Sequence, residues 1–302
     1  MKNLNKLLVF SLFAVEGTMA GCTQEIKDLD PTPVTSKNNL EIAGPFTDFA
    51  VGYDDGPSIN QPIVRVFALG KTTISGGHPV FELRDGNWID ISNGQGALHI
   101  ATQRAIIDVT GNGSAGPCHP VIVDSNNKLL AYTNGSWRDV FIEPLPITPV
   151  DLAIGSGQYF ILDSANVSGG HPVYTYDYGL GYPPTGDGPF GSKKTSASWK
   201  LISGTGAVEL DVARYNVAWV IDSSNRIFYS NNNSSFTSVP GQAIAIGAGV
   251  SGDVAVIAPD RITYRAANSS WIPQSLRPTV TRLDIDANGK LWYLDNGWVK
   301  SL

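Results

Sequence analysis

The chain has 302 residues and a formal net charge of -6 at pH 7. Only 16% of its residues are charged, and its 32 glycines and 19 prolines indicate many turns between short elements, which favours one closed all-β domain over a helical fold. The acidic balance offers no basic surface for phosphate contacts, and it argues against nucleic acid as a partner.

The first residues predict an export signal. Lys2 and Lys6 supply positive charge before an apolar run from Leu7 to Val15. A run of this length is too short to cross a hydrocarbon core of about 30 Å as a helix. Residues 1–21 are therefore predicted to be a signal peptide, and the protein is predicted to be exported.

The segment after the apolar run, Met19 to Cys22, resembles the signal of bacterial lipoproteins, in which small residues precede a lipidated cysteine. The resemblance implies a lipid anchor at Cys22. Thr23, in place of the aspartate that retains such proteins at the inner membrane, implies the outer membrane, on its periplasmic face or at the cell surface. Ordinary cleavage after Ala20 is the alternative. Residues 22–37 are polar and are predicted to be a tether, and the folded domain is predicted at 38–302.

The rest of the sequence repeats itself. Ile74 to Phe81 recurs almost unchanged as Val167 to Tyr174, with a shorter copy at 118–121. A coarser unit is clearest from Val208 to Val239, where four short runs rich in Val, Ile, Tyr and Trp are bounded by Asn, Ser and Gly. This pattern is typical of a four-stranded antiparallel meander. An aromatic residue opens the last strand of each complete unit: Trp88, Trp137, Trp199, Phe236 and Trp271.

These units predict an all-β fold, a six-bladed β-propeller of four-stranded antiparallel blades. The C-terminal unit has three strands, and the run from Asn39 to Gly44 is predicted to be its fourth, so that an N-terminal strand closes the ring and leaves no long open sheet edge. The copy between Ala97 and Ile142 contains one strand-like run too many, and seven blades is the alternative. A long insertion at 179–198 is predicted between the third and fourth strands of its unit.

The repeats resemble the tectonin or tachylectin-type β-propellers, most strongly at Val208 to Tyr229 and Thr281 to Trp298. The resemblance extends over roughly 40–302. It implies the propeller fold and, because propellers of this type often bind carbohydrate, a glycan as the ligand.

Several repeated side chains have a functional and a structural interpretation. His78, His119 and His171 recur and could converge on a metal ion, but the Gly-Gly-His-Pro segment is better explained by its backbone, because glycine permits unusual φ and proline is tolerated at a strand start. No metal and no other cofactor is predicted. The tryptophans are predicted to pack between blades rather than to stack on sugar rings. Repeated aspartates are predicted to close turns rather than to bind calcium: Asp124, Asp163, Asp222 and Asp295.

The cysteines allow two interpretations. Cys118 is the only cysteine besides Cys22. If Cys22 carries a lipid, Cys118 is a small buried residue or a lone thiol; otherwise a disulfide can join the two. The fold does not depend on disulfides in either case.

The sequence favours a binding protein over an enzyme. It contains no Gly-x-Ser-x-Gly elbow, His-Glu-x-x-His pair, phosphate-binding loop or dinucleotide fingerprint. The first hypothesis is a surface-attached, lectin-like module for glycans, the alternative is an accessory or scaffold subunit docked on an outer-membrane protein complex, and a hydrolase ranks third. The insertion is a predicted exposed loop that combines aromatic and polar groups. Its candidate ligand-binding residues are Tyr182, Asp187, Phe190 and Lys193.

Overall fold

A computed structural model describes most of the chain from Pro45 to the C-terminus. The described ranges are 45–54, 62–102, 118–140, 145–155, 158–177, 199–213, 216–231, 233–249, 252–267 and 270–302. Within these ranges the regular structure is β-strand, without an α-helix, and no helix there has the length and hydrophobicity needed to span a membrane. The predicted signal peptide, the tether and Cys22 lie outside the described residues.

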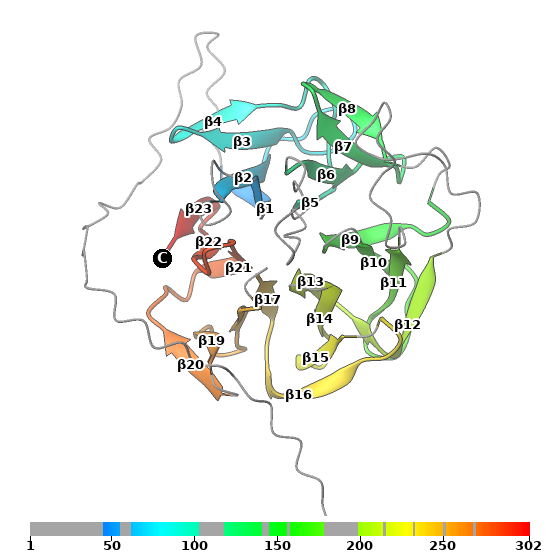
Figure 1. The fold of residues 1–302 in the computed structure, drawn as a ribbon, viewed down its shortest axis with the longest axis vertical. Helices are drawn as coiled ribbons and strands as arrows, with labels where there is room; N and C mark the ends of the chain where they lie inside the picture. The colour runs from blue at the N-terminus through cyan, green and yellow to red at the C-terminus, as the bar shows by residue number, and fades with distance from the viewer. Residues whose placement is uncertain are drawn as a thin grey trace, which may run out of the picture. The chain divides into compact units, whose positions relative to one another are not determined.

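Six antiparallel sheets surround a central axis as the blades of a propeller (Figure 1), and each sheet takes its strands consecutively from the chain. The predicted six-bladed architecture is therefore confirmed. The first three blades contain β1 (Phe46–Asp54), β2 (Ile63–Gly70), β3 (Val80–Arg84), β4 (Asn87–Asp90); β5 (His99–Thr102), β6 (Pro120–Val123), β7 (Leu129–Thr133), β8 (Ser136–Asp139); and β9 (Pro149–Ile154), β10 (Gln158–Asp163), β11 (His171–Asp177), β12 (Lys200–Ala207). The last three blades contain β13 (Glu209–Ala213), β14 (Val217–Ile221), β15 (Arg226–Ser230), β16 (Thr237–Gln242); β17 (Ala245–Ala248), β18 (Val254–Ile257), β19 (Thr263–Ala267), β20 (Ser270–Gln274); and β21 (Val280–Ile285), β22 (Leu291–Asp295), β23 (Trp298–Ser301).

The second blade is a regular four-stranded sheet, β5-β6-β7-β8. The additional strand-like run that suggested seven blades, at 105–111, lies outside the described residues. The sixth sheet has three strands among the described residues, and the predicted closing strand at 39–44 also falls outside them. At the start of β1, the Phe46 N–H donates to the Gly297 carbonyl at 2.6 Å, so the first blade is bonded directly to the β22–β23 turn.

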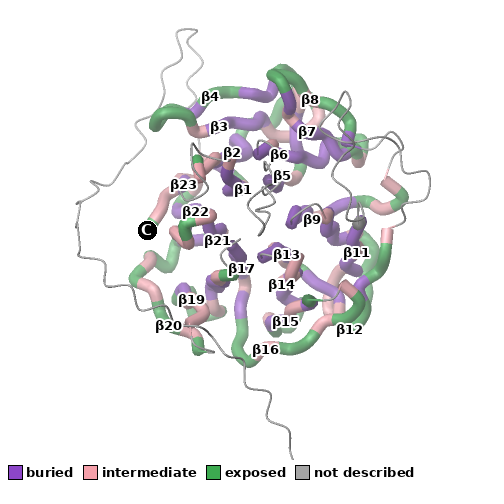
Figure 2. The backbone as a smooth tube through the Cα atoms, viewed as in Figure 1, coloured by how far each residue is buried: buried purple, intermediate pink, exposed green. Residues whose placement is uncertain are grey.

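The core lies between the blades rather than at one centre. Phe160 and Ile161 are neighbours in β10 and are both 0% exposed, yet they pack in two different clusters, because successive side chains of a strand point to opposite faces. Each of the six apolar clusters combines side chains of two adjacent blades. Figure 2 shows the consequence, with buried residues on the inner strands and exposed residues on the outer ones.

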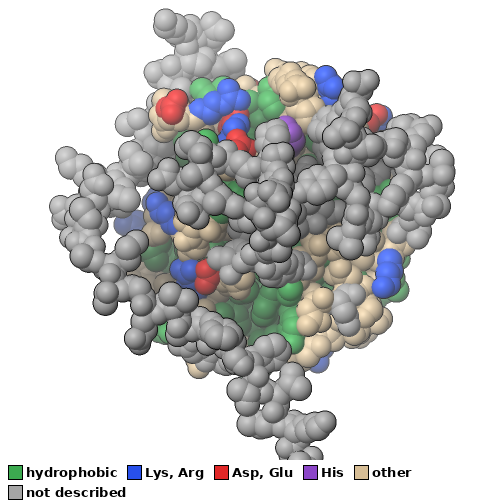
Figure 3. Space-filling view, in the orientation of Figure 1, with side chains coloured by type: hydrophobic (Ala, Val, Ile, Leu, Met, Phe, Trp, Pro, Cys, Tyr) green, Lys and Arg blue, Asp and Glu red, His purple; other side chains and the backbone are tan. Residues whose placement is uncertain are grey.

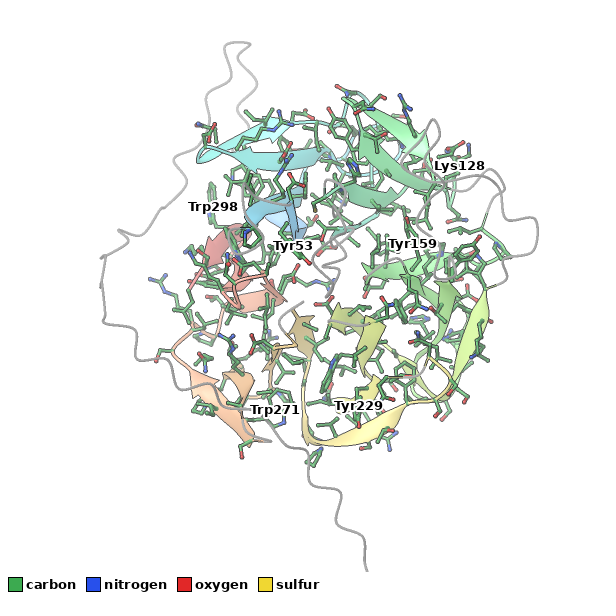
Figure 4. The ribbon with its side chains drawn as sticks, in the orientation of Figure 1. Tyr53, Lys128, Tyr159, Tyr229, Trp271 and Trp298 are labelled. Carbon is green, nitrogen blue, oxygen red and sulfur yellow. The ribbon has the colours of Figure 1, made fainter. Side chains whose placement is uncertain are left out.

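The aromatic residues that open the fourth strands belong to these interfaces. The Trp137 indole N–H donates to the Ile91 carbonyl of the preceding blade at 3.0 Å. In the same way, the Trp271 indole donates to the Pro240 carbonyl at 2.9 Å, at the periphery of the ring (Figure 4). The prediction that the tryptophans pack between blades is confirmed for Trp88, Trp137, Trp199 and Trp271, and at Trp137 and Trp271 the contact includes a hydrogen bond.

Aspartates close the tight turns at two of the predicted positions. Asp124 Oδ1 accepts the backbone N–H groups of Asn126 at 2.9 Å and Lys128 at 2.8 Å, and Asp222 does the same for Ser224 and Arg226. The turn interpretation is confirmed for both residues. The other two carboxylates are used differently. Asp163 accepts the Thr148 N–H at 2.9 Å, and Asp295 accepts bonds from Thr279 and Lys300.

The repeated Gly-Gly segment is a tight turn that contacts the chain just before the first strand of the next blade. Gly77 has φ 135° and Gly170 has φ 127°, in the region that favours glycine. A Cβ at Gly77 would lie 2.4 Å from the Ala97 carbonyl oxygen, and a Cβ at Gly170 would lie 2.5 Å from that of Ala207. The backbone explanation of this repeat is confirmed.

Cys118 is 3% exposed and packs in the cluster between the first two blades, as predicted for a small buried residue. On the face drawn in Figure 3, the visible charged side chains of the described residues form scattered small groups and no basic stripe.

Candidate functional site

The candidate site lies on the propeller axis. The inner strands β1, β5, β9, β13, β17 and β21 contact one another around it, and all six begin at the same end, because each blade repeats the same strand order. We call this end the entry end.

One position on each inner strand occupies the same register, opposite the apolar residue near the end of the second strand. The pairs are Asp48 with Leu69, His99 with Val123, Asp151 with Leu162, Glu209 with Ile221, Ala245 with Ile257 and Arg282 with Leu294. We call these six inner-strand residues the axial ring. In blade order the ring reads Asp, His, Asp, Glu, Ala and Arg, so three carboxylates, one imidazole and one guanidinium surround the axis.

Arg282 links two carboxylates of the ring. Its Nη1 lies 2.6 Å from Glu209 Oε2, and its Nε lies 3.8 Å from Asp48 Oδ1. Glu209 is two blades away from Arg282, and Ala245 holds the ring position of the intervening blade. The side chains remain accessible to water, since 36% of Arg282 and 19% of both Asp48 and Glu209 is exposed.

Two residues further along the inner strands, the carboxylates of Asp211 and Asp284 hold blades together. Asp284 Oδ2 accepts the Val51 N–H of the next blade at 2.7 Å. Asp211 Oδ2 accepts the Ala248 N–H of the next blade at 2.6 Å. The second oxygen of each carboxylate accepts the N–H of the following residue in its own strand. Both groups are therefore structural. Asp151 of the axial ring bonds in the same way, because its carboxylate accepts the Leu152 N–H and the Leu210 N–H of the next blade.

A small cavity of about 60 Å³ lies inside the inner strands. Its polar lining includes Asp48, Asp151, Glu209 and Arg282 of the axial ring. A cavity of this size has room for several water molecules. Pockets that enclose small molecules are typically about 300–1,000 Å³, and this cavity is well below that size.

The surrounding protein shifts the pKa values of the ring. Burial raises the pKa of Asp151 to about 6, although the Arg282 charge opposes this rise. Burial, again opposed by Arg282, raises the pKa of Glu209 to about 8 and also raises that of Asp48, and burial lowers the pKa of His99. Asp48, together with Glu209 and Asp151, raises the pKa of Arg282. The ring therefore holds three carboxyl groups against one guanidinium, and burial favours the protonated form of each carboxyl.

This imbalance predicts a pH dependence of stability. Asp151 binds its proton more tightly in the folded chain, so it lowers the free energy of unfolding as the pH rises from 3.8 to about 6. Asn at this position keeps one oxygen for the Leu152 N–H, which Oδ1 now accepts at 2.9 Å. Its NH2 group cannot accept the Leu210 N–H, to which the carboxylate is also bonded. We expect Asp151→Asn to be less stable than the wild type at pH 4, because it loses this bond, and to recover about 1–2 kcal/mol of the difference between pH 4 and pH 7, measured by urea unfolding across that range.

Asp139→Asn is the control for this measurement. Its side chain is 46% exposed on the outer strand β8, and its only described ion pair is a 3.5 Å contact with Lys128. We expect this variant to follow the wild-type pH profile within about 0.5 kcal/mol. If Asp151→Asn followed it as well, the ring would not hold a carboxyl group of raised pKa.

The candidate ligand-binding residues predicted from the sequence are not part of the axial ring. The insertion lies between β11 and β12, as predicted, but its Tyr182, Asp187, Phe190 and Lys193 lie outside the described residues. In the described part of the chain, no three His, Cys, Asp or Glu side chains come together as metal ligands.

Sequence reasoning missed the axial ring. A signal was present, because five of the six ring residues are polar and each precedes an apolar residue: Asp48-Phe49, His99-Ile100, Asp151-Leu152, Glu209-Leu210 and Arg282-Leu283. Aligning the first strands on those apolar residues would have placed the polar ones in one column.

The fold defines the class of protein, a six-bladed β-propeller. No family model and no curated protein matches the chain. Among solved structures, it is similar to a streptogramin B lyase at 10% identity and TM-score 0.44, with 86% of this chain and 99% of that chain covered. It is also similar to YCF48 bound to a D1 peptide, at 13% identity and TM-score 0.45, with 85% and 81% covered. A third similar structure is BBS1N in complex with ARL6DN, at 10% identity and TM-score 0.49, with 79% and 73% covered. These likenesses concern the fold alone.

Proposed function

We propose that this chain is a non-enzymatic binding module, exported and anchored in the outer membrane through a lipid on Cys22, and that it binds a protein partner at the axial ring. The observation that carries the proposal is the convergence of four charged side chains, Asp48, Asp151, Glu209 and Arg282, around one small cavity. Charged groups that remain accessible to water are suited to recognition, because they can exchange water for a partner of complementary charge.

The described residues favour a protein partner over a glycan at this position. The cavity of about 60 Å³ is far below the size of pockets that enclose a small molecule. The indoles of Trp137 and Trp271 donate hydrogen bonds between blades, so both have a structural role there. A lectin-like function is the second candidate, supported by the tectonin resemblance and by the composition of the 179–198 insertion.

Comparative capture tests the proposal. The full chain, tagged at its C-terminus, is purified in mild detergent from the membranes of its own host as the wild type, as Asp151→Asn/Glu209→Gln and as Asp139→Asn. We expect one protein to co-purify stoichiometrically with the wild type and with Asp139→Asn, and its yield to fall about tenfold or more with the ring variant, a loss of about 1.4 kcal/mol.

The other outcomes are equally informative. Equal capture of the partner by the wild type and the ring variant would contradict binding at the axial ring. Binding on a glycan array that disappears in Tyr182→Ala/Phe190→Ala but persists in the ring variant would favour the lectin-like function. Intact mass spectrometry of the same preparations measures whether Cys22 carries acyl chains, and a mature mass that begins at Gly21 without lipid would contradict the anchor.

A further inference from the structure

The sixth blade has an open edge among the described residues. Its sheet has the order β21-β22-β23, whereas each of the other five sheets has four strands. The strand β23 is the outermost labelled strand of this blade (Figure 1), and no described strand pairs with its outer edge. An edge of this kind presents backbone N–H and C=O groups that can pair with a further strand.

A buried indole at the same blade interface has no hydrogen-bond partner among the described residues. Trp88 is 5% exposed, and its Nε1 atom is buried without an acceptor. The indoles of Trp137 and Trp271, which open the fourth strands of their own blades, donate to the carbonyls of Ile91 and Pro240. Those carbonyls lie in or directly after the fourth strand of the preceding blade. For Trp88 the preceding blade is the sixth, so its acceptor is expected on the strand that would pair with β23.

The interface between the sixth and first blades also lacks an apolar side chain that equivalent interfaces have. In four blades, the residue three positions after the opening aromatic packs in the cluster shared with the following blade: Ile91, Val140, Ile202 and Val239. The cluster between the sixth and first blades contains Trp88 and Val299 but has no such residue in the described part of the chain. A strand beside β23 would have to supply it.

The described chain begins next to this edge. Pro45 lies against Gly297, and the Phe46 N–H donates to the Gly297 carbonyl at 2.6 Å. Gly297 directly precedes β23, so the residue before Pro45 is covalently held near the start of that strand. A connection of one residue is sufficient between blades, because β12 ends at Ala207 and β13 begins at Glu209.

We propose that residues 39–44 of this chain pair with β23 as the fourth strand of the sixth blade, and that a carbonyl of this segment accepts the Trp88 indole N–H. The sequence of the segment fits the position. Aligned with the other fourth strands, Ile42 occupies the apolar position three residues after the opening one, and Leu40 aligns with the half-exposed Ile89 and Ile272. The proposal does not depend on the proposed function.

The repeat also fixes the register of the segment. Ile202 pairs with Val173, which pairs with Leu162 on the second strand of its blade. Val239 occupies the same place in the fourth blade, opposite Ile227, which pairs with Ile221. Leu162, Ile221 and Leu294 are equivalent, because each lies opposite a residue of the axial ring.

Leu294 pairs with Val299. Ile42 therefore lies opposite Val299, and Glu41 lies opposite Lys300, whose Nζ is 3.2 Å from Asp295 Oδ2. Opposite charges across two strands stabilise their pairing. The side chain of Ile42 packs against Trp88 and Val299, and its carbonyl takes the place that the Ile91 carbonyl has beside Trp137 in the next interface.

This strand has a consequence for the direction in which the chain leaves the propeller. In each blade the first and third strands run away from the entry end, and the fourth strand runs back toward it. Residues 39–44 therefore begin at the opposite end of the propeller and finish where β1 begins. The residues before 39, including Cys22, then join the propeller at the end opposite the axial ring.

A cysteine pair tests the register in the full chain. In Glu41→Cys/Lys300→Cys the two residues lie directly opposite, with Cα atoms about 4.5–5.5 Å apart, within the range of about 4.4–6.8 Å that a disulfide spans. Leu40→Cys/Lys300→Cys is the matched control, because its side chains point to opposite faces of the sheet. After mild oxidation and proteolysis, mass spectrometry measures the peptide that links the two positions. We expect about tenfold less of it from the control, and we expect the link of the first pair within one chain.

A second measurement tests the packing. Ile42→Asp is expected to lower the urea midpoint of unfolding, because it places a carboxyl group in an apolar cluster. Leu40→Asp is the control, and we expect it to lower the midpoint less than half as much, since the equivalent Ile89 and Ile272 are 39% and 48% exposed.

Three results would overturn the inference. They are equal disulfide yields from the two cysteine pairs, a disulfide that forms only between two chains, and a urea midpoint that Ile42→Asp leaves unchanged. The second result would show that the strand beside β23 comes from another copy of the chain. None of the three bears on capture of a partner at the axial ring, so the proposed function is tested separately.

Discussion

Arg282→Met is expected to lower the free energy of unfolding by about 2–4 kcal/mol. The substitution removes the one guanidinium of the axial ring and leaves Glu209 and Asp48 without the cation that contacts them at 2.6 Å and 3.8 Å. Breaking a fully buried pair costs about 3–5 kcal/mol, because a charge stays behind without compensation. The range expected here is lower because 36% of the Arg282 side chain is exposed and water screens part of the loss.

Urea unfolding at pH 7.5 measures this cost, and two further variants make the result specific. Arg282→Met/Glu209→Gln removes the carboxylate as well and is expected to recover at least about 1 kcal/mol. Lys128→Met removes a cation that is 47% exposed and lies 3.5 Å from Asp139; it is expected to cost less than about 0.5 kcal/mol. A cost for Arg282→Met as small as that of Lys128→Met would show that the ring does not depend on its guanidinium.

Much of the fold was predictable because it depends on signals that are local in the sequence. An aromatic residue such as Trp271 opens a fourth strand, and Asp222 accepts the N–H of Arg226 four residues later. Gly77 recurs as Gly170 because each turn needs a residue without a Cβ. Each of these signals can be recognised within one unit, and counting the units then gives the number of blades.

The axial ring was not predictable in the same way, because it is built from one residue of each blade. The ring residues differ in chemical type, so a search for identical residues in each repeat does not find them: Asp48, His99, Asp151, Glu209 and Arg282. Their common place follows from strand register, and the connections between the first and second strands vary in length from blade to blade. Five side chains that are far apart in the sequence therefore meet only when the ring of blades closes.

The ring and the blade interfaces have different requirements. At the blade interfaces, apolar side chains of suitable volume are sufficient for packing, as at Phe160. At the axis, six strands converge and polar groups must find partners, which Asp211 and Asp284 achieve by accepting N–H groups of the next blade. Asp151 of the axial ring also accepts an N–H of the next blade, that of Leu210, whereas Glu209 and Asp48 are held by Arg282.

Gly77→Ala is expected to lower the free energy of unfolding by about 3 kcal/mol or more. The residue has φ 135°, and the added Cβ would lie 2.4 Å from the Ala97 carbonyl oxygen. Ala97 cannot move aside easily, because it is 0% exposed and its N–H and carbonyl both bond to the His78 backbone, at 2.9 Å and 2.7 Å. Gly86→Ala is the matched control. Gly86 has φ 76° and no atom within 4 Å of an added Cβ, so only the backbone cost of about 1–2 kcal/mol applies.

The repeat allows a stronger test of the same idea. Gly170 occupies the equivalent turn of the third blade, where an added Cβ would lie 2.5 Å from the Ala207 carbonyl oxygen. Urea unfolding of Gly170→Ala should therefore give a loss close to that of Gly77→Ala. The two turns lie at different blade interfaces, so the losses in the double variant should add within about 0.5 kcal/mol. A loss for Gly77→Ala no larger than that of Gly86→Ala would refute the steric explanation, and a double variant well short of the sum would mean that one disrupted turn already opens the interface at the other.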